Sequence, residues 1–322
     1  MSISDVKVVI NLTTPVREQG FGFPLILESG ATATKNYAEY NSLAAIVEAG
    51  YENTSEVYKL ANIIFMQENA PDKIAICSTN GTALAWLQDE LNVNKEWRQL
   101  LLTDEETYSE VANYIETLQG KILFISENDY EKPLALKRTV CFAGEGACAA
   151  VIGESAGRKV GSFTYKNLIV KGVEVTEVTS EALEAAEEIN ANLIVKKAGD
   201  IVTSDGITTS GEYIDIVDSE DYIIQQITYR TQKLLNNVAK VPYSNNGISM
   251  LESVVFGVLQ ECYNNGMIAT NEDGSPAFSV EFKKRADVND TDVASRKYIG
   301  GQFKFKLAGA IHKVEITGEI EL

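Results

Sequence analysis

The segment of this 322-residue chain with the clearest pattern for chemistry is a glycine loop. Residues 138–153 read RTVCFAGEGACAAVIG, an apolar run followed by Gly144, Gly146 and Ala149. This GxGxxA spacing lets a pyrophosphate approach the amino terminus of a helix. Glu145 lies inside the loop, however, and the next apolar segment, FTYKNLIVK, lacks the acidic residue expected to bind a ribose. A tightly packed helix of small residues explains the same letters. A nucleotide-binding α/β enzyme using the Gly144–Ala149 loop therefore remains an alternative.

Other covalent or metal chemistry would have to use one histidine or four cysteines. His312 lies in AIHKVEITG, which has the pattern of a strand, and no partner can be assigned to it as a base or metal ligand. The cysteines, at positions 77, 141, 148 and 262, lack metal-ligand spacing and lie in apolar stretches, which predicts buried thiols of a reducing cytoplasm. We therefore predict that the protein is not an enzyme and has no catalytic residue, metal ligand or cofactor.

Composition excludes further classes. The chain has 46 acidic and 28 basic residues, a net charge of -18, which would repel the phosphates of nucleic acids. From this charge we expect no nucleic-acid partner. Neither a signal peptide nor an apolar window of membrane-spanning length is found, so we also expect no membrane partner. The 45% of hydrophobic residues indicates a globular chain, whose length suggests about two domains.

The elements that would position a site alternate between strands and helices beyond Pro71. Two helices are predicted within residues 37–66, the second opening at Thr54 or Ser55. Strand patterns then occupy 73–79, 98–104, 121–127, 138–144 and 167–172, and helix patterns occupy 82–91, 105–119, 147–157 and 180–192. This alternation predicts an α/β layer with a mostly parallel sheet across residues 71–195.

The pattern changes in the last third of the chain. Asp205-Gly206 lies between two strand-like runs and predicts a β-hairpin turn. A helix capped near Asp218 or Ser219 and a second one over residues 248–264 follow, and residues 302–322 alternate as strands do. The predicted fold class is α/β plus α+β. The predicted units are an amino-terminal strand arm and linker (1–30), an α/β domain (31–200) and an α+β domain ending in a second strand arm (201–322).

Both ends of the chain have the pattern of unpaired strands. The segment around Val6–Leu12 is apolar on both sides, and the carboxyl end alternates apolar and polar residues to the last position. An unpaired strand needs a partner, either in the same chain or in a neighbour, and both remain open. The charge is also uneven, because residues 280–322 carry eight basic and seven acidic residues, which leaves -19 on the first 279.

Four segments together resemble the tail sheath family of contractile phages, in particular the compact sheath-like proteins of myoviruses. They read YAEYNSLAAIVEAGYENTSEVYKLANIIFMQ (37–67), SGEYIDIVDSEDYIIQQI (210–227), KVPYSNNGISMLESVVFGVLQECYNNGMIA (240–269) and KLAGAIHKVEITGEIEL (306–322). They occur in the family's order, which is more specific than any one of them. The chain is short for such a sheath, since many carry extra outer domains.

The resemblance implies a structural subunit that polymerises as stacked hexameric rings around a tail tube and contracts to drive the tube through the host envelope. Its partners would be other copies of itself, the tail tube protein, and the baseplate and tail terminator proteins. It would be assembled in the host cytoplasm and reside in the virion tail. The carboxyl-terminal domain would lie inside, against the tube. Another tail or baseplate structural protein is the alternative within the same class.

Two sets of residues follow as site hypotheses. Inter-subunit strand arms over residues 5–12 and 313–321 would use Val6, Val8, Ile10, Leu12, Val314, Ile316 and Ile320. Their hinges would lie near Thr13–Gly22 and at Gly300-Gly301 or Gly309. Basic residues facing the tube would be Lys283, Lys284, Arg285, Arg296 and Lys297.

Overall fold

A mostly parallel sheet forms the centre of the first two-thirds of the chain. The computed structural model describes residues 21–103, 108–126, 134–175 and 179–318. Its six-stranded sheet has the order β2-β3-β1-β4-β5-β6, in which only the pairing of β2 with β3 is antiparallel. The strands are β1 (Phe23–Glu28), β2 (Lys35–Tyr40), β3 (Ile74–Ser78), β4 (Trp97–Leu102), β5 (Ile122–Ser126) and β6 (Thr139–Phe142). The predicted fold class is confirmed.

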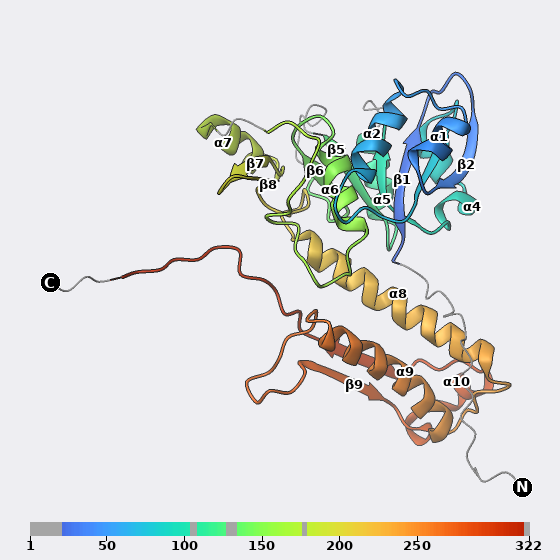
Figure 1. Cartoon of the computed structure of the whole chain (residues 1–322). Coiled ribbons are helices and arrows are strands. Elements are labelled where there is room, and N and C mark those ends of the chain that lie inside the picture. The colour runs from blue at the N-terminus through green and yellow to red at the C-terminus, as the bar shows by residue number, and fades with distance from the viewer. Residues whose placement is uncertain (1–20, 104–107, 127–133, 176–178, 319–322) are drawn as a thin grey trace, which may run out of the picture.

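Helices cover both faces of this sheet (Figure 1). Successive side chains of a strand point to opposite faces, so Ile26 packs into one core cluster while Leu25 and Leu27 pack into the other. The first cluster includes residues of α1 (Leu43–Glu48), α2 (Glu56–Phe65) and α6 (Ala147–Ala156). The second includes residues of α3 (Ala83–Leu87), α5 (Tyr108–Glu116) and α7 (Ser180–Glu188). The short α4 (Glu90–Val93) follows α3.

Two strands differ from the expectation for the amino-terminal part. Residues 23–28 form β1 inside the sheet, paired with β3 and β4, although the sequence suggested a linker there. Residues 35–40 form the edge strand β2, where a helix was predicted from residue 37. The second helix of that region is confirmed, because Ser55 caps α2 and accepts a hydrogen bond from the Tyr58 amide.

The predicted Asp205-Gly206 hairpin turn is wrong. The hairpin pairs β7 (Ile194–Lys197) with β8 (Asp200–Thr203), and its turn is Ala198-Gly199, where both residues have positive φ. Gly206 instead packs against Tyr165, where an added Cβ would lie 2.4 Å from that residue's Cβ. Residues 167–172 contribute only an isolated bridge, Ile169 with Val202, rather than a strand.

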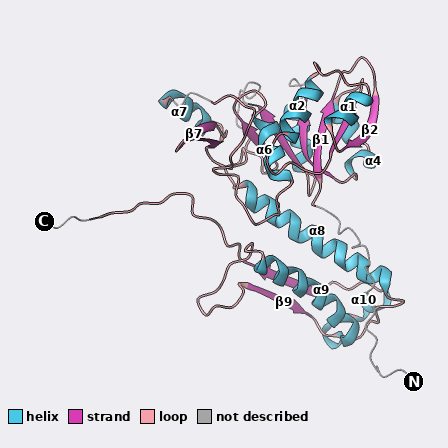
Figure 2. Ribbon diagram, in the orientation of Figure 1, coloured by secondary structure: helices cyan, strands magenta, loops and turns pink. Residues whose placement is uncertain are grey.

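A long helix separates the α/β domain from the carboxyl-terminal elements, as Figures 1 and 2 show. This helix, α8 (Ile214–Asn237), begins four residues before the predicted cap at Asp218, which lies inside it. It packs on α9 (Asn245–Asn264), and α9 packs on a two-stranded antiparallel sheet of β9 (Phe278–Phe282) and β10 (Gly301–Phe305). Between these strands lie the 3-10 turn Arg285–Asp287 and α10 (Asp290–Ala294).

The carboxyl-terminal elements have a core of their own. Ile223 of α8, Val258 and Leu259 of α9, and Met267 are buried together, and Val280 of β9 packs against them. In the described part of the chain no helix is both long and apolar enough to cross a membrane. The four cysteines are free and buried, as predicted.

The contact between α2 and α6 allows a test of this packing. A Cβ at Gly153 of α6 would lie 2.6 Å from the backbone oxygen of Ile64 on α2, and backbone cannot move aside cheaply. Gly153→Ala should therefore lower the free energy of unfolding by about 1–3 kcal/mol. Urea denaturation of the purified subunit measures it.

The matched control is Gly257→Ala on α9, where an added Cβ would meet nothing within 4 Å. This change should leave stability unchanged or raise it by about 0.5–1 kcal/mol, because alanine favours the helix. Equal effects at both positions would contradict the close contact between α2 and α6.

Candidate assembly surfaces

A buried cluster of charged side chains joins α8 to the α/β domain. Arg98 lies on β4, the strand WRQLLL, and donates hydrogen bonds to Asp218 and, at 2.9 Å, to Asp221. Arg138, just before β6, donates to both carboxylate oxygens of Asp221 at 2.7 Å. The Tyr165 hydroxyl donates to Asp218 at 2.7 Å. Since the two aspartates are three residues apart, they share one face of α8, and that face is tied to the sheet.

The charges of this cluster depend on one another. Burial would raise the pKa of Asp221, but the hydrogen bonds from Arg138 and the charges of both arginines hold it below its usual value. Burial would likewise lower the pKa of Arg98, and the two aspartates keep it above its usual value. Burial and the Asp218 charge raise the pKa of Tyr165, so its hydroxyl stays a donor. Removing one charge would therefore leave another buried without its partner.

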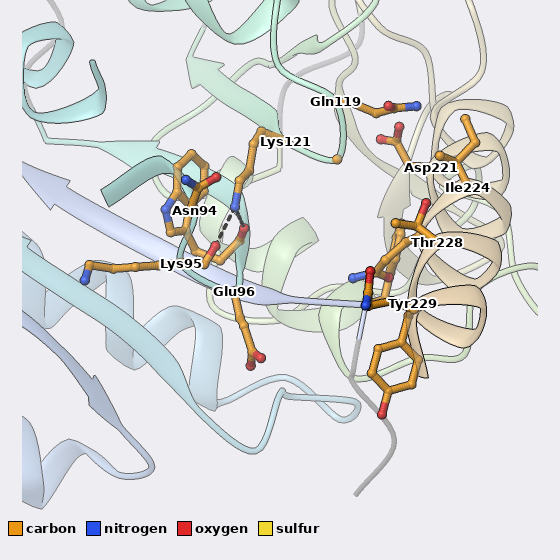
Figure 3. A pocket seen from close by; sticks show the side chains of 14 residues that line it. Asn94, Lys95, Glu96, Gln119, Lys121, Asp221, Ile224, Thr228 and Tyr229 are labelled. Carbon is orange, nitrogen blue, oxygen red and sulfur yellow. Dashed lines mark hydrogen bonds between the residues drawn. The ribbon is translucent and has the colours of Figure 1, made fainter. Parts of the chain in front are cut away.

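An open cleft of about 510 Å³ lies beside this cluster (Figure 3). Residues 94–97 and 119–121 form one wall, and α8 forms the other with Ile224, Thr228 and Tyr229. The Lys121 ammonium donates to the backbone oxygens of Lys95 and Trp97, and burial together with the Arg98 charge lowers its pKa to about 7. Among the described residues no group of three His, Cys, Asp or Glu side chains could hold a metal ion.

The carboxyl end projects from the body of the molecule (Figure 1). Residues 309–318, hereafter the carboxyl-terminal arm, form no strand, although the sequence predicted one there. Three large apolar side chains on the arm face solvent: Ile311 is 85% exposed, Val314 74% and Ile316 88%. A strand needs a hydrogen-bonding neighbour, and the described chain provides none for this segment. The predicted arm residue Ile320 lies outside the described residues.

The two-stranded sheet has edges without a strand partner in the described chain. Each of β9 and β10 pairs only with the other in the described chain, so each has one edge without a strand partner. One face carries Phe278, Val280 and Phe305, which pack with the α9 core. The opposite face carries polar residues, among them Glu281 and Lys304, so a strand added at an edge would extend an amphipathic sheet.

The five basic residues predicted to face the tube lie close together. The Lys283 amide donates to the Gly300 oxygen and the Tyr298 hydroxyl to the Lys283 oxygen, which places residues 283–285 beside 296–297. Lys283, Lys284, Arg296 and Lys297 are exposed, and Arg285 is half-buried and paired with Asp290 at 3.4 Å. The predicted arm residues Val6, Val8, Ile10 and Leu12 lie outside the described residues.

A side chain of α2 packs closely against the glycine loop. Gly144 and Gly146 adopt positive φ, and a Cβ at Gly146 would lie 2.6 Å from the Cδ1 of Ile63 on α2. The α6 residues that follow are buried from Ala147 to Ser155, as the interpretation of a packed small-residue helix expects.

Residues 153–157, GESAG, also have the GxSxG spacing of a nucleophile elbow, although none was expected in this chain. Ser155 is buried in α6 and its hydroxyl donates to the Ile152 oxygen. The single histidine of the chain contacts Tyr213 instead. This arrangement does not fit a nucleophile elbow.

Comparison with known families concerns the part of the chain that carries α8, α9 and the arm. Residues 214–320 match the family model of the E217 tail sheath protein gp31-like C-terminal domain. These residues, about a third of the chain, are similar to that tail sheath domain. The resemblance to contractile tail sheaths inferred from sequence is thereby confirmed, and residues 214–318 are called the sheath domain below. No curated protein sequence is significantly similar to the chain.

Solved structures share the fold of the whole chain. A chain in the structure of the anti-feeding prophage (AFP) baseplate, 6-fold symmetrised, matches with a TM-score of 0.74 and 16% identity over 100% of both chains. A chain of the PVC extracellular contractile injection system sheath complex in the contracted state matches with a TM-score of 0.73 and 10% identity, over 100% of this chain and 99% of that chain. The sheath tail protein of Listeria innocua matches with a TM-score of 0.61 and 10% identity, over 83% of this chain and 90% of that chain.

The residues that join the sheath domain to the sheet were missed in the sequence. Arg98 in an otherwise apolar strand was a usable signal, because a buried arginine requires acidic partners. Asp218 was instead interpreted as a helix cap. Nothing in the sequence alone indicated which of the 46 acidic residues would meet Arg98.

The charged cluster predicts a large, pH-dependent effect of Asp221→Asn. At pH 7 the variant should lose about 3–5 kcal/mol of unfolding free energy, because Arg98 and Arg138 lose their shared carboxylate. Since the pKa of Asp221 is lowered in the folded chain, this contribution is present above the unfolded pKa and disappears as the pH falls through the folded one. Urea denaturation at pH 7 and at acid pH should show the difference shrinking.

The neighbouring Glu220 is the control. It pairs with Lys137 on the surface, and its side chain is 40% exposed. Glu220→Gln should change stability by less than about 0.5 kcal/mol at either pH. If the two variants behaved alike, the cluster would not be what holds α8 to the sheet.

Proposed function

We propose that the protein is the subunit of a contractile tail sheath that polymerises as stacked hexameric rings around a tail tube. It assembles in the host cytoplasm, resides in the virion tail and contracts to drive the tube through the host envelope. It works without catalysis or a cofactor. The sheath-family match of residues 214–320 supports the proposal, as does the fold shared with a PVC sheath solved in the contracted state.

The observation that carries the proposal is the combination of an exposed apolar arm with open sheet edges. The carboxyl-terminal arm lacks a strand partner in its own described chain, and β9 and β10 each have a free edge. A strand that adds to an exposed edge gains backbone hydrogen bonds and pockets for alternate side chains. The arm of one subunit therefore fits the sheath domain of a neighbour, and the segment 5–12 is proposed to do the same.

The energies are large enough for assembly. Burying Ile311, Val314 or Ile316 on a neighbour would contribute about 1.5–3 kcal/mol each, against the entropy of ordering the arm. A subunit held by several such contacts is bound by their sum, so a polymer can form from individually weak contacts.

Contraction requires subunits to move while remaining connected. Strand pairs can persist through rigid-body movement if the arm bends at a hinge. Gly309 suits that role, because its φ is +67° and an added Cβ would meet nothing within 4 Å. The alternative hinge predicted near the carboxyl end, Gly300-Gly301, does not suit it, because Gly301 is paired in β10 and a Cβ at Gly300 would lie 2.9 Å from Lys283.

The tube-facing surface is proposed at Lys283, Lys284, Arg285, Arg296 and Lys297. These residues form one basic area in a chain whose net charge is -18. An acidic tube surface would attract this area and repel the rest of the subunit.

The arm proposal predicts that Val314→Asp with Ile316→Asp abolishes tubes but not folding. Both side chains are exposed in the free subunit, so the change leaves the core intact, whereas burial of the arm on a neighbour would enclose two charges. Negative-stain electron microscopy counts tubes, and circular dichroism checks the fold.

Leu91→Asp is the control, because Leu91 is 78% exposed on the α/β domain. It should assemble as the wild type does. Deleting residues 1–14 tests the amino-terminal arm in the same assay and should give a folded subunit that makes no tubes. Normal tubes from either arm variant would refute the exchange of that arm.

The tube-facing proposal predicts that Lys283→Glu, Lys284→Glu and Lys297→Glu together weaken attachment to the tube without unfolding the subunit. The effect should come from charge, so raising the salt concentration should reduce the difference from wild type. Co-sedimentation with tubes measures attachment.

The control variant replaces Lys59, Lys171 and Lys196 with glutamate. These lysines lie on the α/β domain, and the three substitutions give the same change in net charge. If both triple variants bound the tube equally, the basic area would not face it.

A baseplate role is the second candidate, since the fold is also found in a chain from the AFP baseplate structure. The number of copies per particle separates the two roles. A sheath subunit is present in many rings, whereas a baseplate component is present in few.

A further inference from the structure

The residues from which the two proposed arms extend, Phe21 and His312, are called the arm roots below. Both contact α8 or its cap residue. Phe21, the first described residue, makes an edge-to-face contact with Tyr222, with ring centres 5.5 Å apart. At the other end, His312 makes an edge-to-face contact with Tyr213, the cap residue of α8, with ring centres 4.7 Å apart. Two segments that are about 290 residues apart in sequence thus meet the same ten-residue stretch.

Phe21 has a second contact besides the Tyr222 ring. The Arg98 guanidinium lies 4.1 Å from its ring centre. The next residue, Gly22, has a φ of +109°, and a Cβ there would lie 2.8 Å from the Cβ of Arg98. The chain therefore enters β1 along a path that the Arg98 side chain sets.

His312 is held where the arm leaves the body. The last backbone hydrogen bond before it joins the Ala308 amide to the Met267 oxygen, and Gly309 follows with positive φ. The neighbouring residues Ile311 and Lys313 are exposed. The Nε2 of His312 and the Oδ1 of Asp215 in α8 are both buried without a hydrogen-bond partner. The His312 side chain therefore connects the arm to the beginning of α8.

The two contacts lie on opposite sides of the helix. Tyr213 and Tyr222 are nine positions apart, which is about two and a half turns and roughly 13 Å along the axis. Asp218 and Asp221, which bind Arg98, lie between them. The same stretch of α8 therefore contacts the α/β domain, the start of the described chain and the arm.

We propose that the first part of α8, residues 214–222, together with its cap residue Tyr213, is the common anchor of both chain ends, with Phe21 and His312 as the residues that position them. The inference rests on the proposed function, in that the two ends are taken to be inter-subunit arms. It adds that Phe21 and His312, from which the two arms extend, are held relative to each other by one helix within each subunit. While His312 remains on Tyr213, the two arm roots move together, and bending of the arm at Gly309 requires that this contact be released.

The test measures the separation of the two roots in the free subunit. Spin labels are attached at Gly20→Cys and Lys313→Cys; the four native cysteines are buried and stay unlabelled. Diluting labelled protein with unlabelled protein removes contributions between subunits. Electron–electron resonance should give a narrow distance distribution in the parent protein. His312→Ala and Phe21→Leu should each broaden it.

Conservative variants separate positioning from folding. His312→Phe keeps a ring against Tyr213 and should retain the narrow distribution. Ile311→Ala changes a side chain that is 85% exposed and should also retain it. Trypsin cleavage after Lys313 should be about two- to tenfold faster in His312→Ala, as expected for loss of one aromatic contact. Cleavage after Lys196 in the β7–β8 hairpin should not change.

A broad distribution in the parent, or an unchanged one in both His312→Ala and Phe21→Leu, would overturn the anchor. Thermal unfolding of each variant shows whether the fold survives. Because the assay uses free subunits, it does not depend on tube formation. The proposed function is tested separately, by whether the variant that lacks residues 1–14 still forms tubes.

Discussion

The arrangement of this protein depends on one buried arginine. Arg98 can remain inside the sheet only because Asp218 and Asp221 neutralise it, and those residues place α8. Since a buried charge without a partner costs several kcal/mol, the geometry at this junction is tightly constrained. Since α8 is the first helix of the sheath domain, the position of that domain relative to the α/β domain follows from this pairing. A small number of charged contacts thus determines the relation between two separately packed cores.

The rest of the molecule divides into rigid and adaptable parts. The α/β domain has a sheet covered on both faces, with glycines such as Gly153 that leave no space between helices. The sheath domain is smaller, and much of its two-stranded sheet remains accessible. The carboxyl-terminal arm has almost no contacts of its own. Burial of side chains therefore decreases from the α/β domain through the two-stranded sheet to the arm.

Sequence reasoning succeeded where the signal was local. Continuous apolar runs correctly predicted strands β3 to β6, and Ser55 correctly predicted the start of α2. It failed where pairing with distant residues decides the structure. Residues 23–28 look like a linker until β3 and β4 flank them, and Asp205-Gly206 has the chemistry of a hairpin turn while Ala198-Gly199 makes the turn. The charged cluster could not be predicted because the partners of its hydrogen bonds lie 53 to 123 residues apart in the sequence. The alternation near the carboxyl end predicted a strand, and residues 309–318 form none in the described chain.

The exposed arm also affects the subunit before any assembly begins. Ile311, Val314 and Ile316 present an adhesive segment to every other copy in solution, which favours disordered aggregates as well as ordered ones. The net charge of -18 on each copy opposes such encounters, because two like-charged bodies repel at close range. A single arm contact has to overcome this repulsion alone, whereas an ordered growing end offers several contacts for the same electrostatic cost. In the proposed sheath, charge and arm together would suppress spontaneous nucleation and favour growth on an existing template.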